Sequence, residues 1–174
     1  MKTLIISLIL IFNLLSFEKI NAENNFSYLD LDSILSASLA GKSISNQILI
    51  IQENNNKKFT KQQKKLLEQE KSIIGKKNIL SKEEFDKSVL AFKKDVNNFK
   101  KKRAELIKKT NNQRLKAMKL LLDKLNPILA KYSDDNSISL IVQKKNIIIG
   151  KSELDITSDI MKLLNKEIKK ININ

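Results

Sequence analysis

Lysine is the residue type that gathers most clearly into one part of this sequence. Residues 57–124 hold 22 Lys and Arg against eight Asp and Glu, whereas the rest of the chain has 11 of each. The whole formal charge of +14 therefore lies on this segment. Such an excess attracts anionic partners, among them nucleic acid, anionic lipid headgroups and acidic polypeptides. The chemistry it predicts is electrostatic binding, with a merely solvated helix face as the alternative for individual lysines.

Groups suited to catalysis or metal binding are scarce. The sequence has no His and no Cys, and it lacks a glycine-rich phosphate loop. Asp30, Asp32 and Asp155 are scattered, as expected of residues that cap helices or aid solubility. We therefore expect no enzyme activity and no cofactor. Without Cys there is no disulfide framework, so helix packing or oligomerisation must supply stability.

The first 22 residues have the pattern of a secretory signal peptide. Lys2 gives a positive start, an apolar run follows from Leu4 to Phe17, and Ala22 supplies the small residue at a cleavage site. The apolar run is short for a membrane span, which needs about 20 residues. We expect cleavage after Ala22 and export of the mature chain, with an uncleaved membrane anchor as the alternative. Export argues against nucleic acid as the partner in the cell.

The basic segment is predicted to lie on two long helices. The second begins at a capping box, with Ser81 as N-cap and Glu84 three residues later, and extends to about Leu125, a length of roughly 65 Å. Gly75 interrupts the apolar pattern before it, so the connection should lie near Gly75 to Leu80 and the helices should run antiparallel. The apolar residues repeat as in a heptad seam: Phe59, Leu66 and Ile73 on the first helix, and Phe85, Val89, Phe92, Val96 and Phe99 on the second.

This seam has two interpretations. It is narrow and discontinuous, which fits a two-helix arm and not a buried bundle helix. Its side chains either form an ordinary coiled-coil core or are partly exposed and contact an apolar client. The basic surface beside it comprises Lys93, Lys94, Lys100, Lys101, Lys102, Arg103, Lys108 and Lys109.

The segments on either side of the arm are predicted to form a small α/β body. Asn126-Pro127 should end or kink the second helix and start a short new one. Residues 138–142 and 147–149 then read as two antiparallel strands, and residues 26–31 offer a third. Asp155 or Thr157 should cap a last helix, whose apolar residues at helical spacing are Ile156, Ile160, Leu163, Leu164 and Ile168. A sheet this small is marginal alone, so we expect it to join subunits through Phe26, Tyr28, Leu29, Leu31, Ile138, Leu140, Val142, Ile147 and Ile149.

The order of these segments resembles the Skp/OmpH family of periplasmic chaperones. The resemblance covers residues 23–170 and rests on "YLDLDSIL", "LSKEEFDK", "NPILAKYS", "ISLIVQKKNIIIG" and "LDITSDIMKLLNK". It implies a mainly helical homotrimer in which strands of three subunits form a β-barrel body. Three coiled-coil arms, each a long antiparallel helical hairpin, would enclose a cavity. The expected domains are the signal peptide (1–22), the body (23–42 and 126–174) and the arm (43–125).

The same resemblance implies an ATP-independent holdase that keeps unfolded outer-membrane proteins from aggregating. The arm departs from the pattern in being rich in Asn and Lys, with a weak apolar seam. We find no separate cluster for lipopolysaccharide and do not carry that property over. Two other functions stay open: a tethering coiled coil on anionic membrane surfaces, and a nucleic-acid-binding protein, which export disfavours.

Overall fold

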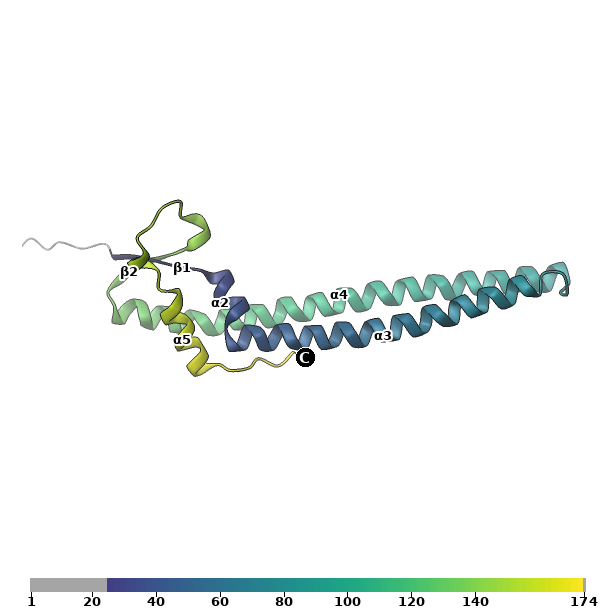
Figure 1. Ribbon diagram of the computed structural model, residues 1–174, viewed down its shortest axis with the longest axis horizontal. Helices are drawn as coiled ribbons and strands as arrows, with labels where there is room; N and C mark the ends of the chain where they lie inside the picture. Colours follow the sequence, from purple (N-terminus) through teal and green to yellow (C-terminus); the bar gives the residue numbers. More distant parts are fainter. Residues whose placement is uncertain (1–24, 174) are drawn as a thin grey trace, which may run out of the picture.

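The computed structural model describes residues 25–173, so the predicted signal peptide and its cleavage after Ala22 lie outside the described residues. A small body of strands and short helices sits at one end, and two long helices extend from it (Figure 1). In chain order the elements are β1 (Asn25–Leu29), α2 (Leu31–Ala37), α3 (Leu39–Gly75), α4 (Lys82–Asp135), β2 (Ile138–Gln143), two 3₁₀ turns (Lys144–Asn146 and Ser152–Leu154) and α5 (Thr157–Glu167).

Helices α3 and α4 form the long projection. They contain 37 and 54 residues, or about 55 and 80 Å at 1.5 Å per residue. A six-residue connection joins them at the tip, between Gly75 and Lys82, and they lie side by side in opposite directions (Figure 1). The predicted capping box is confirmed: the Ser81 hydroxyl accepts a hydrogen bond from the Glu84 N–H, and the Glu84 carboxylate accepts one from the Ser81 N–H.

The predicted end of the second helix at Asn126-Pro127, and the start of a new one there, are wrong. Helix α4 continues through Pro127 for eight more residues, to Asp135. A proline inside a helix removes one hydrogen bond and crowds the preceding turn. Leu125 and Ile128 on either side are buried in the core, and their burial outweighs that local cost. The residues expected to form a separate short helix therefore belong to α4, while the division into body and arm stays a prediction.

The sheet also differs from the expected hairpin. Strand β2 pairs with β1, and the two are parallel, with Phe26 opposite Leu140 and Tyr28 opposite Val142. A parallel pair requires a long crossover, which α2, α3 and α4 provide. Residues 147–149 form no strand: the chain turns at Lys144–Asn146, and in the described part of the chain these residues pair with neither edge of the two-stranded sheet. The predicted antiparallel strand pair is therefore wrong.

The predicted third strand ends earlier than expected. Leu31 begins α2 instead of extending β1, because the Asp30 carboxylate accepts a hydrogen bond from the Ser33 N–H at 2.8 Å and caps the helix. The residues of "YLDLD" alternate between apolar and polar as in a strand, but Leu31 is the first residue of a helix. Among residues 25–173, the sheet therefore has two strands, and an isolated bridge joins Tyr28 to Asp155.

The hydrophobic core lies where the long helices meet the body. Ile34 of α2, Ile44 of α3 and Leu121 of α4 are almost fully buried there, with Ile160 and Leu164 of α5. The burial of Ile160 and Leu164 confirms the apolar face predicted for the last helix. Neither Asp155 nor Thr157 is the N-cap, so that prediction is wrong: the N-cap is Ile156, which makes no side-chain hydrogen bond to the helix. The Asp155 carboxylate, just before it, accepts a hydrogen bond from the Thr157 N–H at 3.0 Å.

The segment after α5 returns along α3 (Figure 1). Ile171 is buried, and its carbonyl accepts a hydrogen bond from the Gln47 side chain at 2.6 Å. The same side chain accepts one from the Ile173 N–H at 3.1 Å. Asn165 accepts another from the Leu39 N–H at 2.7 Å. The base of the long projection is thus held from several sides.

No single helix in the described part of the chain has both the length and the apolar character to cross a membrane. Helices α2 and α3, which meet at a bend of 60°, pass that test only when taken together.

Candidate functional site

The apolar residues predicted for the arm lie along the line where α3 and α4 face each other. Leu66 is buried, at 8% exposure, and the other seven side chains are half-buried. These seven are Phe59, Ile73, Phe85, Val89, Phe92, Val96 and Phe99. The seam therefore holds two helices together while each side chain keeps part of its surface in solvent.

An aromatic pair crosses the middle of the arm. The rings of Phe59 on α3 and Phe99 on α4 are 6.3 Å apart at an angle of 79°, an edge-to-face arrangement. The guanidinium of Arg103 lies 5.8 Å from the centre of the Phe59 ring, within reach of a cation–π contact. The pair is thus a direct aromatic contact between the two helices at the middle of the arm.

Polar contacts fill the seam on either side of this pair. Toward the body, the Asn55 amide donates to the Thr110 hydroxyl at 3.4 Å, and Thr110 is buried at 4% exposure. Toward the tip, the Gln69 amide donates to the Asp95 carboxylate at 3.1 Å. Net stabilisation from such bonds is small, on the order of 1 kcal/mol each. The arm is therefore held weakly along much of its length.

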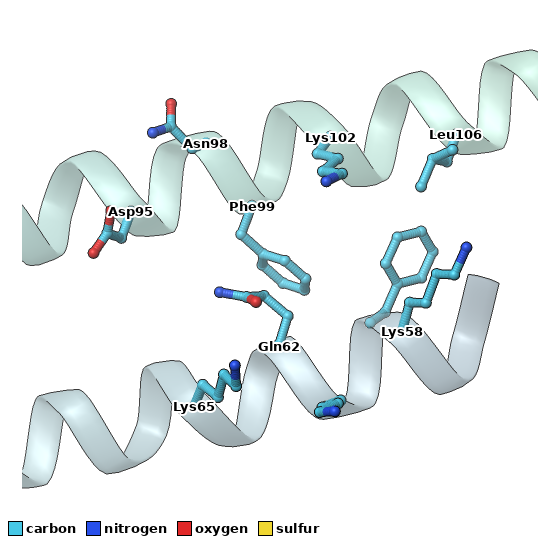
Figure 2. Close-up of a pocket in the computed structure, with 10 residues that line it drawn as sticks. Lys58, Gln62, Lys65, Asp95, Asn98, Phe99, Lys102 and Leu106 are labelled. Carbon is cyan, nitrogen blue, oxygen red and sulfur yellow. The ribbon is translucent and has the colours of Figure 1, made fainter. Parts of the chain in front are cut away.

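A pocket of about 520 Å³ opens beside the aromatic pair. Phe99 projects from α4 into the space between the helices, toward Gln62 of α3 (Figure 2). Leu106 adds a third apolar wall, and Asn98 and Asp95 add polar ones. Four lysines complete the lining: Lys58, Lys61 and Lys65 from α3 and Lys102 from α4.

The basic side chains predicted for the arm surface are all exposed. They are Lys93, Lys94, Lys100, Lys101, Lys102, Arg103, Lys108 and Lys109. In the part of the chain that the structure describes, none of them lies within 4.0 Å of a carboxylate oxygen. Their charge is thus available to an anionic partner, as the charge distribution predicts.

The residues predicted for assembly divide into two groups. Tyr28 and Leu29 are buried inside this chain, so they already belong to its own core, while Leu31, Ile138, Val142 and Ile147 are half-buried. Phe26 and Leu140, paired across the two strands, are about half exposed. Ile149 is 91% exposed, and its neighbour Ile148 is 98% exposed. The structure therefore leaves an apolar surface along the sheet and in the segment that follows it.

A parallel sheet with its strands left open at the edges is unusual in a single chain, since such sheets are normally covered. A second hollow, of about 380 Å³, lies between β2 and α4 and is lined by apolar residues that include Leu125, Leu129 and Leu140. It borders the exposed face of β2. The body thus has unfilled apolar space next to unpaired strand edges.

A match to a family profile identifies the family. The profile of the family described as outer membrane protein (OmpH-like) matches residues 25–164, from β1 into α5. The chain belongs to the OmpH-like family. This confirms the resemblance seen in the sequence. Among proteins with curated descriptions, none matches this sequence significantly.

A solved structure shares the fold of this OmpH-like chain. A protein from Caulobacter crescentus CB15, described as an OmpH-like outer membrane chaperone, superposes with a TM-score of 0.81. The match covers 88% of this chain and 90% of the other, at 17% sequence identity. At this identity the likeness concerns the fold, which is mostly helical with a small sheet.

One ion pair orders the segment after β2 in this OmpH-like chain. The Lys144 ammonium donates to the Asp155 carboxylate at 2.7 Å, and Asp155 also accepts from Thr157. Partial burial by itself would raise the pKa of Asp155, but the hydrogen bonds from Lys144 and Thr157 outweigh it and leave that pKa below its usual value. The hydrogen bond to Asp155 raises the pKa of Lys144.

Sequence reasoning missed several residues at these sites. Asn55 and Gln62 belong to polar stretches that interrupt the apolar repeat of the first arm helix. That interruption is the sequence signal that could have indicated polar contacts between the helices. Gln47, which binds the terminal segment, has no pattern around it that predicts such a role. Across residues 25–173 no group of three or more His, Cys, Asp or Glu is placed to bind a metal ion.

Proposed function

We propose that this protein is a periplasmic chaperone of the holdase type, which binds unfolded outer-membrane proteins without ATP and prevents their aggregation. The observation that carries this proposal is the arm: two antiparallel helices, about 55 Å along α3, with a half-buried apolar seam and, among the described residues, eight exposed basic side chains that have no carboxylate oxygen within 4.0 Å. The family to which the chain belongs supports the same role.

The chemistry of such a client fits the arm. Strands of outer-membrane barrels alternate apolar and polar residues, and in water they aggregate through their apolar faces and unpaired edges. Many weak contacts with partly exposed Phe and Val side chains hold such a chain without burying it in one site. The basic surface attracts carboxylates over roughly one Debye length, about 8–10 Å at ordinary ionic strength. Binding should therefore weaken as salt rises.

We further propose that three copies assemble through the body. The half-exposed Phe26 and Leu140, the open strand edges and the exposed Ile149 support this part of the proposal. Completing the sheet with strands from other copies would pair its edges and bury the apolar surface. Three arms would then surround a shared space for the client.

The assembly is tested by light scattering on the mature chain, residues 23–174. A trimer is expected, and changing Ile138, Leu140 and Ile147 together to Ser should dissociate it because their apolar area leaves the interface. A matched variant with Leu49, Ile50 and Leu90 changed to Ser removes exposed apolar groups from the long helices and should stay trimeric. A monomer for the unchanged chain would contradict the assembly.

The holdase activity is tested by diluting an unfolded β-barrel outer-membrane protein from urea and following its turbidity. Equimolar trimer should suppress aggregation at low salt and less so at high salt. Changing Lys93, Lys94 and Lys100 to Gln should reduce the suppression. The control changes Lys166, Lys169 and Lys170, which lie after the start of α5, and should leave it intact. Equal turbidity with and without the unchanged protein would overturn the proposal.

Tethering to anionic membranes is the competing function. Ile148 and Ile149, almost fully exposed next to Lys144, Lys145 and Lys151, are the observation that favours it. Each basic residue near an anionic surface contributes on the order of 1 kcal/mol. Vesicles with anionic lipid should then carry the protein upward in a flotation gradient at physiological salt, without any client. Absence of flotation removes this function.

A further inference from the structure

The pocket beside Phe59 and Phe99 differs from the rest of the arm. A neighbouring hollow toward the body is also lined by both helices, with Asn55 and Thr110 among its residues, but it has no lysine in its lining, whereas four lysines line this one of about 520 Å³. Its floor is apolar, made by the two rings and Leu106. This volume falls within the range of small-molecule and side-chain binding sites, roughly 300–1,000 Å³.

The charge around this pocket is unbalanced. Lys58, Lys61, Lys65 and Lys102 line it, and within the described residues none of them has a carboxylate oxygen within 4.0 Å. The one acidic group in the lining, Asp95, accepts a hydrogen bond from Gln69. Like charges gathered in this way repel one another, and an anionic ligand relieves the repulsion.

We propose that this pocket binds an aromatic side chain of a client segment while the surrounding lysines bind carboxylates on either side of it. This inference rests on the proposed function and names the kind of segment that the arm selects. An aromatic ring can pack against the exposed parts of Phe59 and Phe99 in offset or edge-to-face geometry. Carboxylates next to it reach the lysine ammonium groups and make charge-assisted hydrogen bonds.

The shape of the site favours a peptide over a lipid. The apolar floor is short, three side chains long, so it matches one ring and not an acyl chain. The amides of Gln62 and Asn98 provide donors and acceptors for a peptide backbone lying across the pocket. Clients with aromatic residues beside acidic ones should therefore be held more firmly than clients of equal charge that lack them.

The test uses three fluorescent peptides with identical Gly-Ser flanks and different centres. Glu-Tyr-Glu carries both features, Glu-Ala-Glu lacks the ring, and Lys-Tyr-Lys reverses the charge. Binding to the mature, assembled protein is measured by fluorescence anisotropy at low salt. The first peptide is expected to bind about tenfold more tightly than the second, because the ring adds an aromatic contact, and the third should bind least.

Two charge-matched double variants locate the site. Lys65→Gln with Lys102→Gln removes one pocket lysine from each helix. The control, Lys64→Gln with Lys101→Gln, replaces the lysines that directly precede Lys65 and Lys102 in the sequence. These two lie at nearly the same distance along the arm but on a different face of each helix, and they do not line the pocket. The pocket variant should bind Glu-Tyr-Glu about tenfold more weakly, and the control variant less than threefold. All four side chains are exposed, so helicity by circular dichroism should not change.

The outcomes separate this inference from the proposed function. If both double variants lose affinity equally, or if Glu-Ala-Glu binds as tightly as Glu-Tyr-Glu, the arm attracts clients by diffuse charge and the pocket proposal is overturned, even where aggregation is still suppressed. If anionic vesicles displace the bound peptide from the unchanged protein but not from the pocket variant, the pocket takes lipid headgroups and the proposal is also overturned. Failure to suppress client aggregation, with peptide discrimination retained, overturns the holdase instead.

Discussion

The base of the arm and its outer part consist of the same two helices in very different surroundings. At the base, Ile44 of α3 and Leu121 and Leu125 of α4 are at most 1% exposed. Farther out, Phe85 and Phe92 are only half-buried, and polar pairs such as Asn55 with Thr110 interrupt the seam. At the base, α2, α5 and the terminal segment cover the helices, while along the outer arm, among the described residues, α3 and α4 pack on each other alone.

This difference separates two tasks. The base holds nearly all of the fully buried apolar area, which supplies the stability of the fold. The outer arm has few buried contacts and many exposed side chains, which is the physical description of a region that opens locally at low cost. A surface that must fit clients of different shapes benefits from such a property. Equivalent substitutions should therefore change the free energy of unfolding by very different amounts in the two regions.

The largest difference is expected for apolar truncation. Leu125→Ala at the base removes a fully buried side chain and should lower the free energy of unfolding by about 2–5 kcal/mol. Val96→Ala in the outer seam removes half-buried methyl groups and should cost about 1 kcal/mol or less. Urea unfolding followed by circular dichroism, at one protein concentration, compares them. Similar losses would mean that the outer seam is a true core.

Two glycines of α3 give the next contrast. A Cβ added at Gly41 would overlap with the Leu35 carbonyl oxygen, a backbone atom that cannot move aside freely. Gly41→Ala should therefore destabilise the fold by about 3 kcal/mol. Gly75, at the tip, has no atom within 4 Å of such a Cβ, and Gly75→Ala should be neutral or stabilise by about 0.5 kcal/mol. Thermal unfolding of both variants measures the contrast, and a tolerated Gly41→Ala would contradict the close packing of α2 on α3.

The long helices could be predicted from sequence because their signals are local. The heptad spacing of Phe85, Phe92 and Phe99, the Ser81 capping box and the interruption at Gly75 each act within a few residues. The structure places the end of α3 and the start of α4 where these signals put them. The break at Pro127 was a local signal too, but the burial of residues next to it overrides the local preference.

The sheet could not be predicted in the same way because strand pairing is not local. Residues 138–143 do form a strand, as their apolar–polar alternation indicates. Their sequence does not indicate that the partner strand is β1, more than 100 residues earlier, or that the two strands are parallel. The β-branched run at 147–149 has strand propensity but pairs with no strand between residues 25 and 173. The arm pocket could not be predicted for a similar reason. Lys102 lines the same pocket as Lys58 and Lys65 because of how α4 is aligned along α3, and that alignment is not a local property of the sequence.

An intermediate effect is expected at Asp155, in the body. Its pKa is lowered in the folded protein, because the hydrogen bonds from Lys144 and Thr157 outweigh partial burial. A lowered pKa contributes stability above the usual carboxyl pKa near 3.8, and that stability is lost as the pH falls toward the folded value. Asp155→Asn should therefore lower the free energy of unfolding by about 1 kcal/mol at pH 7 and by less below pH 3.

Glu105→Gln provides the matched control on the arm, where the carboxylate is exposed. Urea unfolding at pH 7 and at pH 3 should show no difference between this variant and the unchanged protein at either pH. If Asp155→Asn were equally destabilising at both pH values, the loss would come from packing and not from the charge of the carboxylate.

The smallest effect on global stability is expected at the tip of the arm. Ser81→Ala removes the hydroxyl that accepts from the Glu84 N–H, and so frays the first turn of α4. If the outer arm opens independently of the base, amide hydrogen exchange in residues 82–86 should speed up roughly fivefold while the urea midpoint stays unchanged. Asp30→Ala removes the corresponding cap from α2, which packs in the core, and should lower the midpoint instead. If Ser81→Ala lowered the midpoint as well, tip and base would unfold as one cooperative unit. The arms could then adapt to clients only by moving as whole units about the body.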